Sequence, residues 1–537
     1  MTPSRRTLTH ALVSALAIFC CNLSAAQTSE VKMIVLDTPA ELVQVRIMVR
    51  AGSAFDPVGL EGLSNLTAQL ILEGSYGDPK APVTKEKLAE FVRQWGSAAK
   101  PSVAVEKETA TFSMSVPLDV LPQYVDRVLH PLFTQPLFAQ EELDRVRLEF
   151  LEDIGSTLRL ENTELLGLYG LDNFLHHGTS YGHAPIGTVQ GLKAVKRGDI
   201  LAFYKTYYAP ESLIVGLNTM DDDVVRLVQQ ALETVGGNTE VGMLEKQIPE
   251  PPHPIDGRYL TIVIQPGTIA SGIHAGFPLL LTRSHPDYWS LYVANIFFGT
   301  HRDGFGRLYR DIRQTRGYNY GDYSYIEWFN DRPFYLFPPP NTPRGHQYFS
   351  LWVRPVAHQY VHHILKAITW ELENFIREGM TPEECRLAKN KAKVLYLNLA
   401  ETSSRLLGYK LDDEFYGMSE HGYLDEYLQA IDRLTPGEIN TAIRKYLQTE
   451  NLKYVIVTNE EWANRLKKDI AENRNARGKN FKEYNIDFTV SNGDTLWQFP
   501  KNKMEVVQMD KVWEIYWLDI PSENIEVARS SQLFENR

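Results

Sequence analysis

Histidines spaced one helical turn apart are the first residues of this chain that could hold a metal ion. His358 and His362 lie four residues apart, and on a helix that spacing places two imidazoles on the same side. No acidic residue follows at a spacing that completes a ligand set, so an aromatic-rich amphipathic helix explains the pair better. We therefore expect no metal site from these histidines.

The sequence contains no motif for nucleotide binding or for a serine hydrolase. There is no phosphate-binding loop, no dinucleotide fingerprint and no Gly-x-Ser-x-Gly sequence. The net charge is −12 and the pI is near 5.7, and no block of five or six basic residues occurs. These features argue against nucleic acid or an anionic membrane as a partner. We also expect no membrane span, because after the first 26 residues no stretch has 18 consecutive apolar residues.

Residues 51–77, AGSAFDPVGLEGLSNLTAQLILEGSYG, carry the most informative pattern of the chain. The segment resembles the active-site segment of the pitrilysin/insulinase (inverzincin) family, in which a Gly-Ser turn and a Gly-Leu step lead into a helix with His-x-x-Glu-His. The two His of that motif bind zinc, and the Glu activates the metal-bound water. Aligned on the Gly-Leu step, this chain has Asn65, Ala68 and Gln69 at the three positions.

Those three residues cannot do the chemistry of the family's motif. An amide is a weak neutral ligand for zinc, and the methyl group of Ala68 cannot accept a proton. The family's third ligand is a Glu on a later helix, and Asp144 in EELDRVRLEFLEDI stands at the matching place. One carboxylate without its two His partners does not hold zinc. We expect this chain to have no cofactor of its own and to be inactive alone.

A second segment of the chain matches a different motif of the family, and here the functional residues are kept. It is GTHRDGFGRLYRDIRQTRGYNYGDYSY, from residue 299. In the family this place has a Gly-rich turn, an Arg on a helix, and a Tyr at the start of a strand. The resemblance assigns these roles to Arg313 and Tyr320, which are seven residues apart. A guanidinium can bind a substrate carbonyl or carboxylate, and a phenol can donate to the oxyanion formed when water attacks a peptide. An ordinary surface Arg and a packed strand Tyr are the alternative interpretation.

This asymmetry leads to a hypothesis about function. In family members built from two chains, one subunit supplies the zinc motif and the other supplies Arg and Tyr, and the two close into a clam-like chamber. The chain resembles the second kind: a zinc-free subunit of a heterodimeric zinc metallopeptidase acting on short or unfolded peptides, with zinc on a homologous partner. The alternatives are an inactive peptide-binding or scaffold protein of the same fold, and a homodimer with an unorthodox site.

The resemblance implies that the elements positioning these segments form an α+β fold of two homologous units, each a mainly antiparallel sheet with helices packed on one face. We expect a first domain at residues 31–235, a Gly- and Pro-rich linker at 236–256, a second domain at 257–460 and an extension at 461–537. Residues 42–50 alternate apolar and polar side chains, as a half-buried strand does. Thr84, Thr381 and Thr435 are expected to cap helices.

Two further expectations concern a strand and the extension. By the resemblance, ETATFSMSV at residues 108–116 is predicted to be the open sheet edge to which an extended peptide adds as a strand. The alternative is a paired interior strand. In the extension, TLWQFP and VWEIYWLDIP are predicted to be strand-like and to pack on the second unit or on a partner.

The first residues are predicted to be an export signal, because a basic start, an apolar run and a small-residue site end near residue 26. Its removal leaves Cys385 as the single cysteine, which excludes an intrachain disulfide. The expected location is the periplasm.

Overall fold

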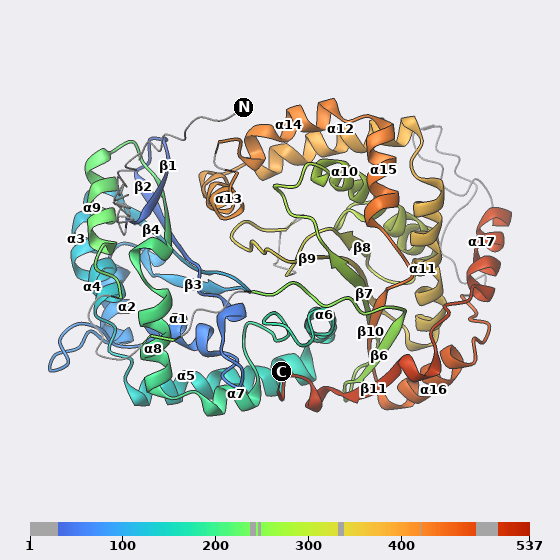
Figure 1. The fold of residues 1–537 in the computed structure, drawn as a ribbon, viewed down its shortest axis with the longest axis horizontal. Coiled ribbons are helices and arrows are strands. Elements are labelled where there is room, and N and C mark those ends of the chain that lie inside the picture. The colour runs from blue at the N-terminus through green and yellow to red at the C-terminus, as the bar shows by residue number, and fades with distance from the viewer. Residues whose placement is uncertain are drawn as a thin grey trace, which may run out of the picture.

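The computed structural model describes residues 30–236, 243–244, 249–330, 338–418, 420–479 and 503–536. The predicted export signal and TLWQFP lie outside these residues. Two α+β units lie side by side, the first in blue to green on the left of Figure 1 and the second in green to red on the right. Among the described helices, none has the length and apolar character needed to cross a membrane.

The first unit is built on a five-stranded sheet in the order β1-β5-β2-β4-β3. One pair, β1 with β5, is parallel and the others are antiparallel. The strands are β1 (Lys32–Leu36), β2 (Leu42–Val49), β3 (Ser102–Val105), β4 (Ala110–Pro117) and β5 (Leu213–Asn218). The helices are α1 (Leu63–Glu73), α2 (Lys85–Arg93), α3 (Leu121–Tyr124), α4 (His130–Thr134), α5 (Gln140–Asp153), α6 (Thr163–Leu175), α7 (Val189–Ala194), α8 (Arg197–Tyr207) and α9 (Asp222–Leu232).

The second unit is built on a six-stranded sheet in the order β11-β6-β10-β7-β9-β8. Its strands are β6 (Tyr259–Ile264), β7 (Ser271–Leu279), β8 (Asp322–Tyr325), β9 (Gln347–Val356), β10 (Lys453–Thr458) and β11 (Ile525–Arg529). Its helices are α10 (Tyr288–Gly299), α11 (Val361–Glu378), α12 (Pro382–Leu399), α13 (Ser403–Tyr416), α14 (Tyr423–Arg433), α15 (Pro436–Tyr446), α16 (Glu460–Ala471) and α17 (Lys503–Ile515). The predicted fold class, two mainly antiparallel sheets with helices, is confirmed.

Local sequence explains where these elements begin. Along β2, the buried Val43, Val45 and Ile47 alternate with less buried residues, so one face of the strand joins the core. Thr84, Thr381 and Thr435 each accept a hydrogen bond from the third residue of the helix that follows, as predicted. The last two also have the reciprocal Glu of a capping box.

Each unit places one helix on the sheet of the other unit. Helix α6 packs against β7 and β10, and α13 packs against β5 and β1. The contacts are close because of glycine: a Cβ on Gly167 of α6 would lie 2.5 Å from the His274 ring, and one on Gly216 of β5 would lie 2.4 Å from Leu411 of α13. The side of each sheet that does not face its own helices is therefore partly covered by its neighbour, and the two units form one body.

Two sequence-based predictions about strands are wrong. The segment at residues 108–116 is not a sheet edge, because β4 lies between β2 and β3, and β3 is the edge strand instead. The first part of VWEIYWLDIP is helical rather than strand-like, because it forms the last turn of α17 and buries Trp513 against the second unit.

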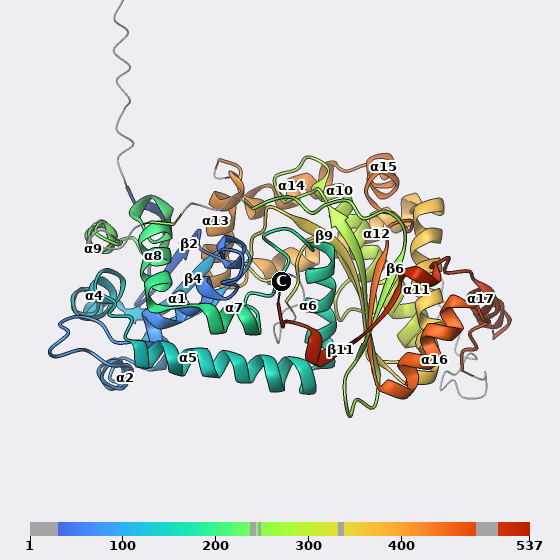
Figure 2. The same cartoon turned by 60° about the horizontal axis from the view of Figure 1, so that its bottom comes forward.

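The extension does pack on the second unit, as expected, and then returns to the first. Strand β11 pairs in parallel with β6 and completes the larger sheet. Beyond it, the backbone carbonyl of Phe534 accepts a hydrogen bond of 2.8 Å from the amide of Val189 at the start of α7, and the Phe534 side chain is buried in the first unit's core. Figure 2 shows the C-terminus beside α6 and α7.

Candidate functional site

Helix α1 is held at its start by a buried carboxylate. Asp56 accepts hydrogen bonds of 2.7 Å from the amides of Gly62 and Ser64, and its Oδ2 lies 3.1 Å from Nε2 of His183. Gly62 has a φ of 108°, a conformation that glycine adopts without strain. His183 thus supports the start of the helix through Asp56.

The three positions of the family's zinc motif do not fit zinc. Asn65 donates its amide N–H to the carbonyl of Pro185 at 3.1 Å, which directs this side chain to the protein backbone. Ala68 is fully buried. Gln69 is half-buried and lies on the same side of the helix as Asn65. In the described part of the chain, no group of three or more His, Cys, Asp or Glu side chains could hold a metal ion.

Asp144, the residue matching the third ligand, is engaged elsewhere. Its Oδ1 lies 2.6 Å from the guanidinium of Arg147 and accepts a hydrogen bond from Gln140 at 3.0 Å. Its side chain is 54% exposed. It is therefore a surface ion-pair residue on α5.

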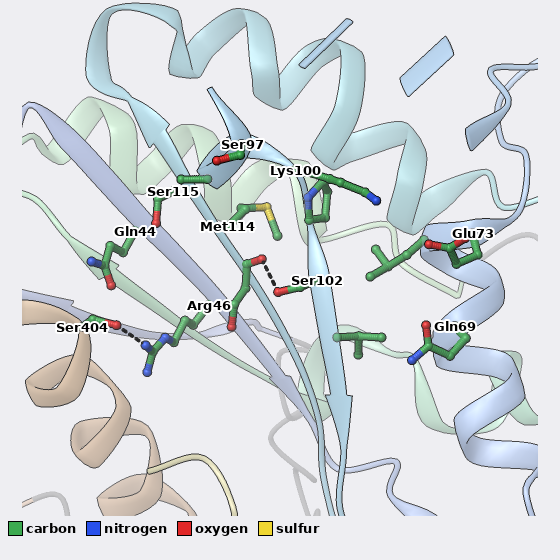
Figure 3. Close-up of a pocket in the computed structure, with 15 residues that line it drawn as sticks. Gln44, Arg46, Gln69, Glu73, Ser97, Lys100, Ser102, Met114, Ser115 and Ser404 are labelled. Carbon is green, nitrogen blue, oxygen red and sulfur yellow. Dashed lines mark hydrogen bonds between the residues drawn. The ribbon is translucent and has the colours of Figure 1, made fainter. Parts of the chain in front are cut away.

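A groove of 590 Å³ opens where α1 faces the edge of the first sheet (Figure 3). Gln69 and Glu73 line it from α1, and Glu73 is paired with Lys85. Arg46 lines it from β2, where its guanidinium donates to Asn341 at 2.7 Å and to Ser404 of α13. The remaining lining residues are Gln44, Leu72, Ser97, Ala98, Lys100, Pro101, Ser102, Val103, Ser113, Met114 and Ser115. The groove is thus a polar slot beside β3.

The backbone of β3 has a defined open side. The amide of Glu106 donates to the carbonyl of Thr109 at 2.8 Å, so these two residues form a hydrogen-bonded pair where the β3-β4 hairpin closes. Because such pairs alternate along an antiparallel ladder, Val105 and Val103 direct their N–H and C=O groups away from β4. An extended peptide could add to this side of β3 as a further strand.

Arg313 and Tyr320 lie on the second unit, outside that groove. Arg313 belongs to a π-helical turn at Tyr309–Gln314, where its guanidinium lies 4.8 Å from the centre of the Tyr309 ring. Tyr320 lies in the turn just before β8, and the residue is 79% exposed. The structure therefore does not bring the two predicted residues to Asn65 and Gln69. Tyr320 is exposed to solvent, and Arg313 is stacked on Tyr309.

A buried carboxylate lies next to this pair. Asp322 begins β8 and is fully buried, and its Oδ1 accepts a hydrogen bond from Asn319 at 2.8 Å. Burial raises the pKa of the Asp322 carboxyl to about 8, although the Asn319 hydrogen bond and the charge of Arg313 act in the opposite direction. The group is therefore mostly protonated near neutral pH.

His358 and His362 do not lie on one α-helix as the sequence indicated, because α11 begins at Val361. His358 lies in a 3-10 turn just before α11, where Nε2 accepts from the Asn459 amide at 3.0 Å and Nδ1 lies 2.7 Å from the hydroxyl of Ser271. His362 is buried at the start of α11, and burial lowers its pKa to about 3. It therefore stays neutral.

One polar cluster has no counterpart among the sequence-based predictions. Lys107 and Asp172 of the first unit and Arg344 of the second are all fully buried. Lys107 Nζ lies 3.0 Å from Asp172 Oδ2, and Arg344 donates to Asp172 Oδ1 at 2.8 Å. Arg344 also lies 3.9 Å above the ring of Trp328. The cluster joins the units, and each member taken alone gives no motif.

Two family models match the chain. The model described as insulinase (peptidase family M16) covers residues 32–163, and the one described as peptidase M16 inactive domain covers residues 194–392. The chain belongs to the M16 peptidase family, and the residues at its zinc motif make it a member with a deficient zinc site.

Curated relatives agree with this family. An uncharacterized zinc protease of Streptomyces coelicolor is 25% identical over 338 residues, which is 61% of this chain and 67% of that protein. An uncharacterized zinc protease of Mycobacterium bovis is 25% identical over 275 residues, which is 50% of this chain and 56% of that protein. The chain thus spans between about half and two thirds of these relatives.

Solved structures share the fold. The peptidase M16 inactive domain from Pseudomonas fluorescens has a TM-score of 0.67 at 18% identity, covering 80% of this chain and 96% of that one. The first half of the periplasmic protease PqqL from Escherichia coli has a TM-score of 0.58 at 15% identity, covering 81% and 90%. At these identities the likeness concerns the fold alone.

Proposed function

We propose that this chain is the zinc-free subunit of a heterodimeric zinc metallopeptidase. A homologous subunit with an intact His-x-x-Glu-His motif supplies the metal and the general base, and this chain supplies Arg313 and Tyr320. The likeness to the first half of PqqL, a protease solved as one part of a larger molecule, supports a two-part assembly. Without its partner the chain is inactive.

The observation that carries this proposal is that the chain lacks the zinc-binding residues of the family but keeps its Arg and Tyr. Asn65, Ala68 and Gln69 provide neither zinc ligands nor a base, whereas Tyr320 as a whole residue is 79% exposed. A buried catalytic group could serve only this chain, but an exposed one can reach a site on another subunit. There the Tyr320 hydroxyl donates to the oxyanion of the attacked peptide, and the Arg313 guanidinium holds a carbonyl or carboxylate of the substrate.

The substrates are short or unfolded peptides in an extended conformation. The outward backbone groups of β3 and the polar groove beside it support this substrate class, because backbone hydrogen bonds recognise an extended chain whatever its side chains. The predicted export signal makes the periplasm the compartment in which the subunit acts.

Reconstitution tests the proposal. The chain is mixed with a family member from the same source that carries His-x-x-Glu-His, and cleavage of a fluorogenic unstructured peptide is followed. Tyr320→Phe should lower kcat on the order of 10²–10³-fold, because one oxyanion donor is lost. Arg313→Ala should also weaken peptide binding. Tyr396→Phe, a half-buried tyrosine on α12 that packs on Tyr427, is the matched control and should leave kcat unchanged.

The same experiment also tests the alternative, an inactive peptide-binding or scaffold protein. The groove beside β3 favours that alternative, since it could hold a peptide without hydrolysing it. If size exclusion shows that both variants assemble with the partner and both retain wild-type kcat/KM, Arg313 and Tyr320 are structural. The scaffold function is then the better one.

A further inference from the structure

The segment that carries Arg313 and Tyr320 is held by the C-terminal part of the chain. Between the π-helical turn and β8, residues 317–321 form no regular structure, and Gly317 has a φ of 60°. Tyr320 lies in this stretch with its side chain mostly in solvent. Its position therefore comes from its neighbours in the sequence. Asn319 and Gly321 are hydrogen-bonded to the backbone of Arg354 in β9, and Arg316 and Tyr318 hold the start of the stretch.

Arg316 is anchored to α17. Its side chain is fully buried, and Nε lies 2.6 Å from Oδ1 of Asp510. The guanidinium lies 4.0 Å from the centre of the Trp513 ring. Asp510 and Trp513 are three residues apart, so one side of α17 provides both contacts. A planar guanidinium with an ion pair at one edge and a ring on its face has little freedom to move.

Tyr318 is anchored to the stretch that follows α16. Its hydroxyl accepts a hydrogen bond from the amide of Lys479 at 2.8 Å, and Nζ of Lys479 donates to the carbonyl of Gly317 at 2.7 Å. The fit around the hydroxyl is tight. A Cβ on Gly478 would lie 2.4 Å from the Tyr318 hydroxyl and 2.7 Å from Nε2 of His363.

The two anchoring pieces are also fixed to each other and to α11. The amide of Ala476 donates to the carbonyl of Glu514 at 3.0 Å, and the carbonyl of Ala476 lies 2.8 Å from Nδ1 of His363. Nζ of Lys366 donates to the carbonyl of Arg474 at 2.9 Å. All of these anchoring residues after α11 lie beyond residue 392, where the second family model ends.

We propose that residues 474–479 and 510–513 form a C-terminal clamp that positions the Arg313–Tyr320 segment for the reaction. Its role in catalysis rests on the function proposed above, whereas its hold on the segment does not. Groups that stabilise a transition state must be placed to within about 0.5 Å, and a loop without regular structure reaches that precision only if packed neighbours fix it. Arg316 and Tyr318 are thus positioning residues, with Asp510 and Gly478 as their supports.

Hydrogen–deuterium exchange of the full purified chain tests the hold. Asp510→Asn removes the carboxylate that pairs with Arg316, and Gly478→Ala pushes on Tyr318. Each should raise amide exchange in the peptide covering residues 315–322 by about tenfold or more, with the first sheet unchanged. Asp510→Glu keeps the carboxylate and should restore exchange to within about twofold of wild type. Arg529→Gln breaks an exposed ion pair with Glu460 elsewhere in the extension and is the matched control.

The clamp would be overturned if amide exchange in residues 315–322 stayed within about twofold of wild type in both Asp510→Asn and Gly478→Ala. The reconstituted enzyme tests the catalytic role: Asp510→Asn should lower kcat more than it changes KM, and Asp510→Glu should recover kcat. If exchange rises as expected but kcat stays at the wild-type value, the clamp stands as a structural device. The assignment of Arg313 and Tyr320 to the reaction then fails instead.

Discussion

Arg344 of the second unit donates a hydrogen bond of 2.8 Å to Asp172 of the first, and both side chains are fully buried. The other oxygen of Asp172 pairs with Lys107, so one carboxylate holds two cations in the interior. Burial lowers the pKa of Lys107 to about 8, whereas the two cations hold the pKa of the Asp172 carboxyl well below its usual range, although burial acts to raise it. The units are therefore joined by charge as well as by apolar packing.

Removing members of this cluster should destabilise the chain in a defined order. Arg344→Ala should cost about 3–5 kcal/mol, because a buried pair loses one partner. Asp172→Ala should cost more, since it leaves Lys107 and Arg344 buried without their carboxylate. Urea unfolding followed by circular dichroism measures both. Asp223→Ala, which breaks an exposed pair with Arg226, is the control and should change nothing measurable. The reverse order of the two variants would contradict the assigned geometry.

The isolated chain should bind no stoichiometric zinc and cleave no peptide, because Asn65, Ala68 and Gln69 offer neither ligands nor a base. Metal analysis after dialysis against a mild chelator checks this. The double variant Asn65→His and Gln69→His is a positive control, since two His one turn apart on a half-exposed helix face should take up some zinc. One tightly held zinc ion in the wild-type chain would contradict the expectation.

Much of the fold could be predicted because local patterns decide it. The alternation in β2 and the Thr caps depend on residues a few positions apart, and they appear where expected. The place of a strand within the sheet could not be predicted, and the expectation that residues 108–116 form an edge is wrong. Apolar and polar side chains alternate in edge strands and in interior strands alike, so the sequence of β4 does not reveal its position in the sheet. Its outer neighbour β3 has only four residues, too few for a clear pattern.

The candidate site shows the same limit. Asn65, Ala68 and Gln69 could be found because a motif fixes their spacing on one helix. Lys107 and Arg344 could not, because they are 237 residues apart and a charged residue is expected at the surface. The support of Arg316 by Asp510 cannot be predicted from the sequence for the same reason. Contacts between distant segments depend on packing that no local spacing records.

The open side of β3 gives a test of peptide binding. Val103→Pro removes an outward N–H without breaking the ladder to β4, and it should weaken the capture of an extended peptide roughly 2- to 10-fold. Val103→Ala keeps the N–H and should lose less affinity than Val103→Pro, because it only shortens a side chain that lines the groove. Ala104→Pro interrupts a bond to β4 and should instead lower stability. Fluorescence anisotropy with a labelled unstructured peptide measures binding, and equal affinity of Val103→Pro and wild type would show that peptides do not add at this edge.

Asp322 should make stability depend on pH. Its carboxyl has a pKa of about 8 in the folded chain, against about 3.9 in an unfolded one. Between these two pKa values the carboxyl is protonated in the folded chain and ionised in the unfolded chain. The stability that Asp322 contributes is therefore fully present below the unfolded-state pKa. It is lost as the pH rises through the folded-state pKa. The loss is at most about 1.4 kcal/mol per pH unit in that window.

Asp322→Asn cannot ionise and keeps a group of the same shape beside Asn319. The free energy of unfolding of this variant, relative to wild type, should therefore increase from about pH 5 to about pH 8. Urea unfolding at several pH values measures the difference, which cancels the titration of all other groups. Asp223→Asn, at a side chain that is 88% exposed, should show no such trend. Parallel curves for wild type and Asp322→Asn would mean that Asp322 is ionised in the folded chain. Asp322 and Arg313 would then have to form a buried ion pair.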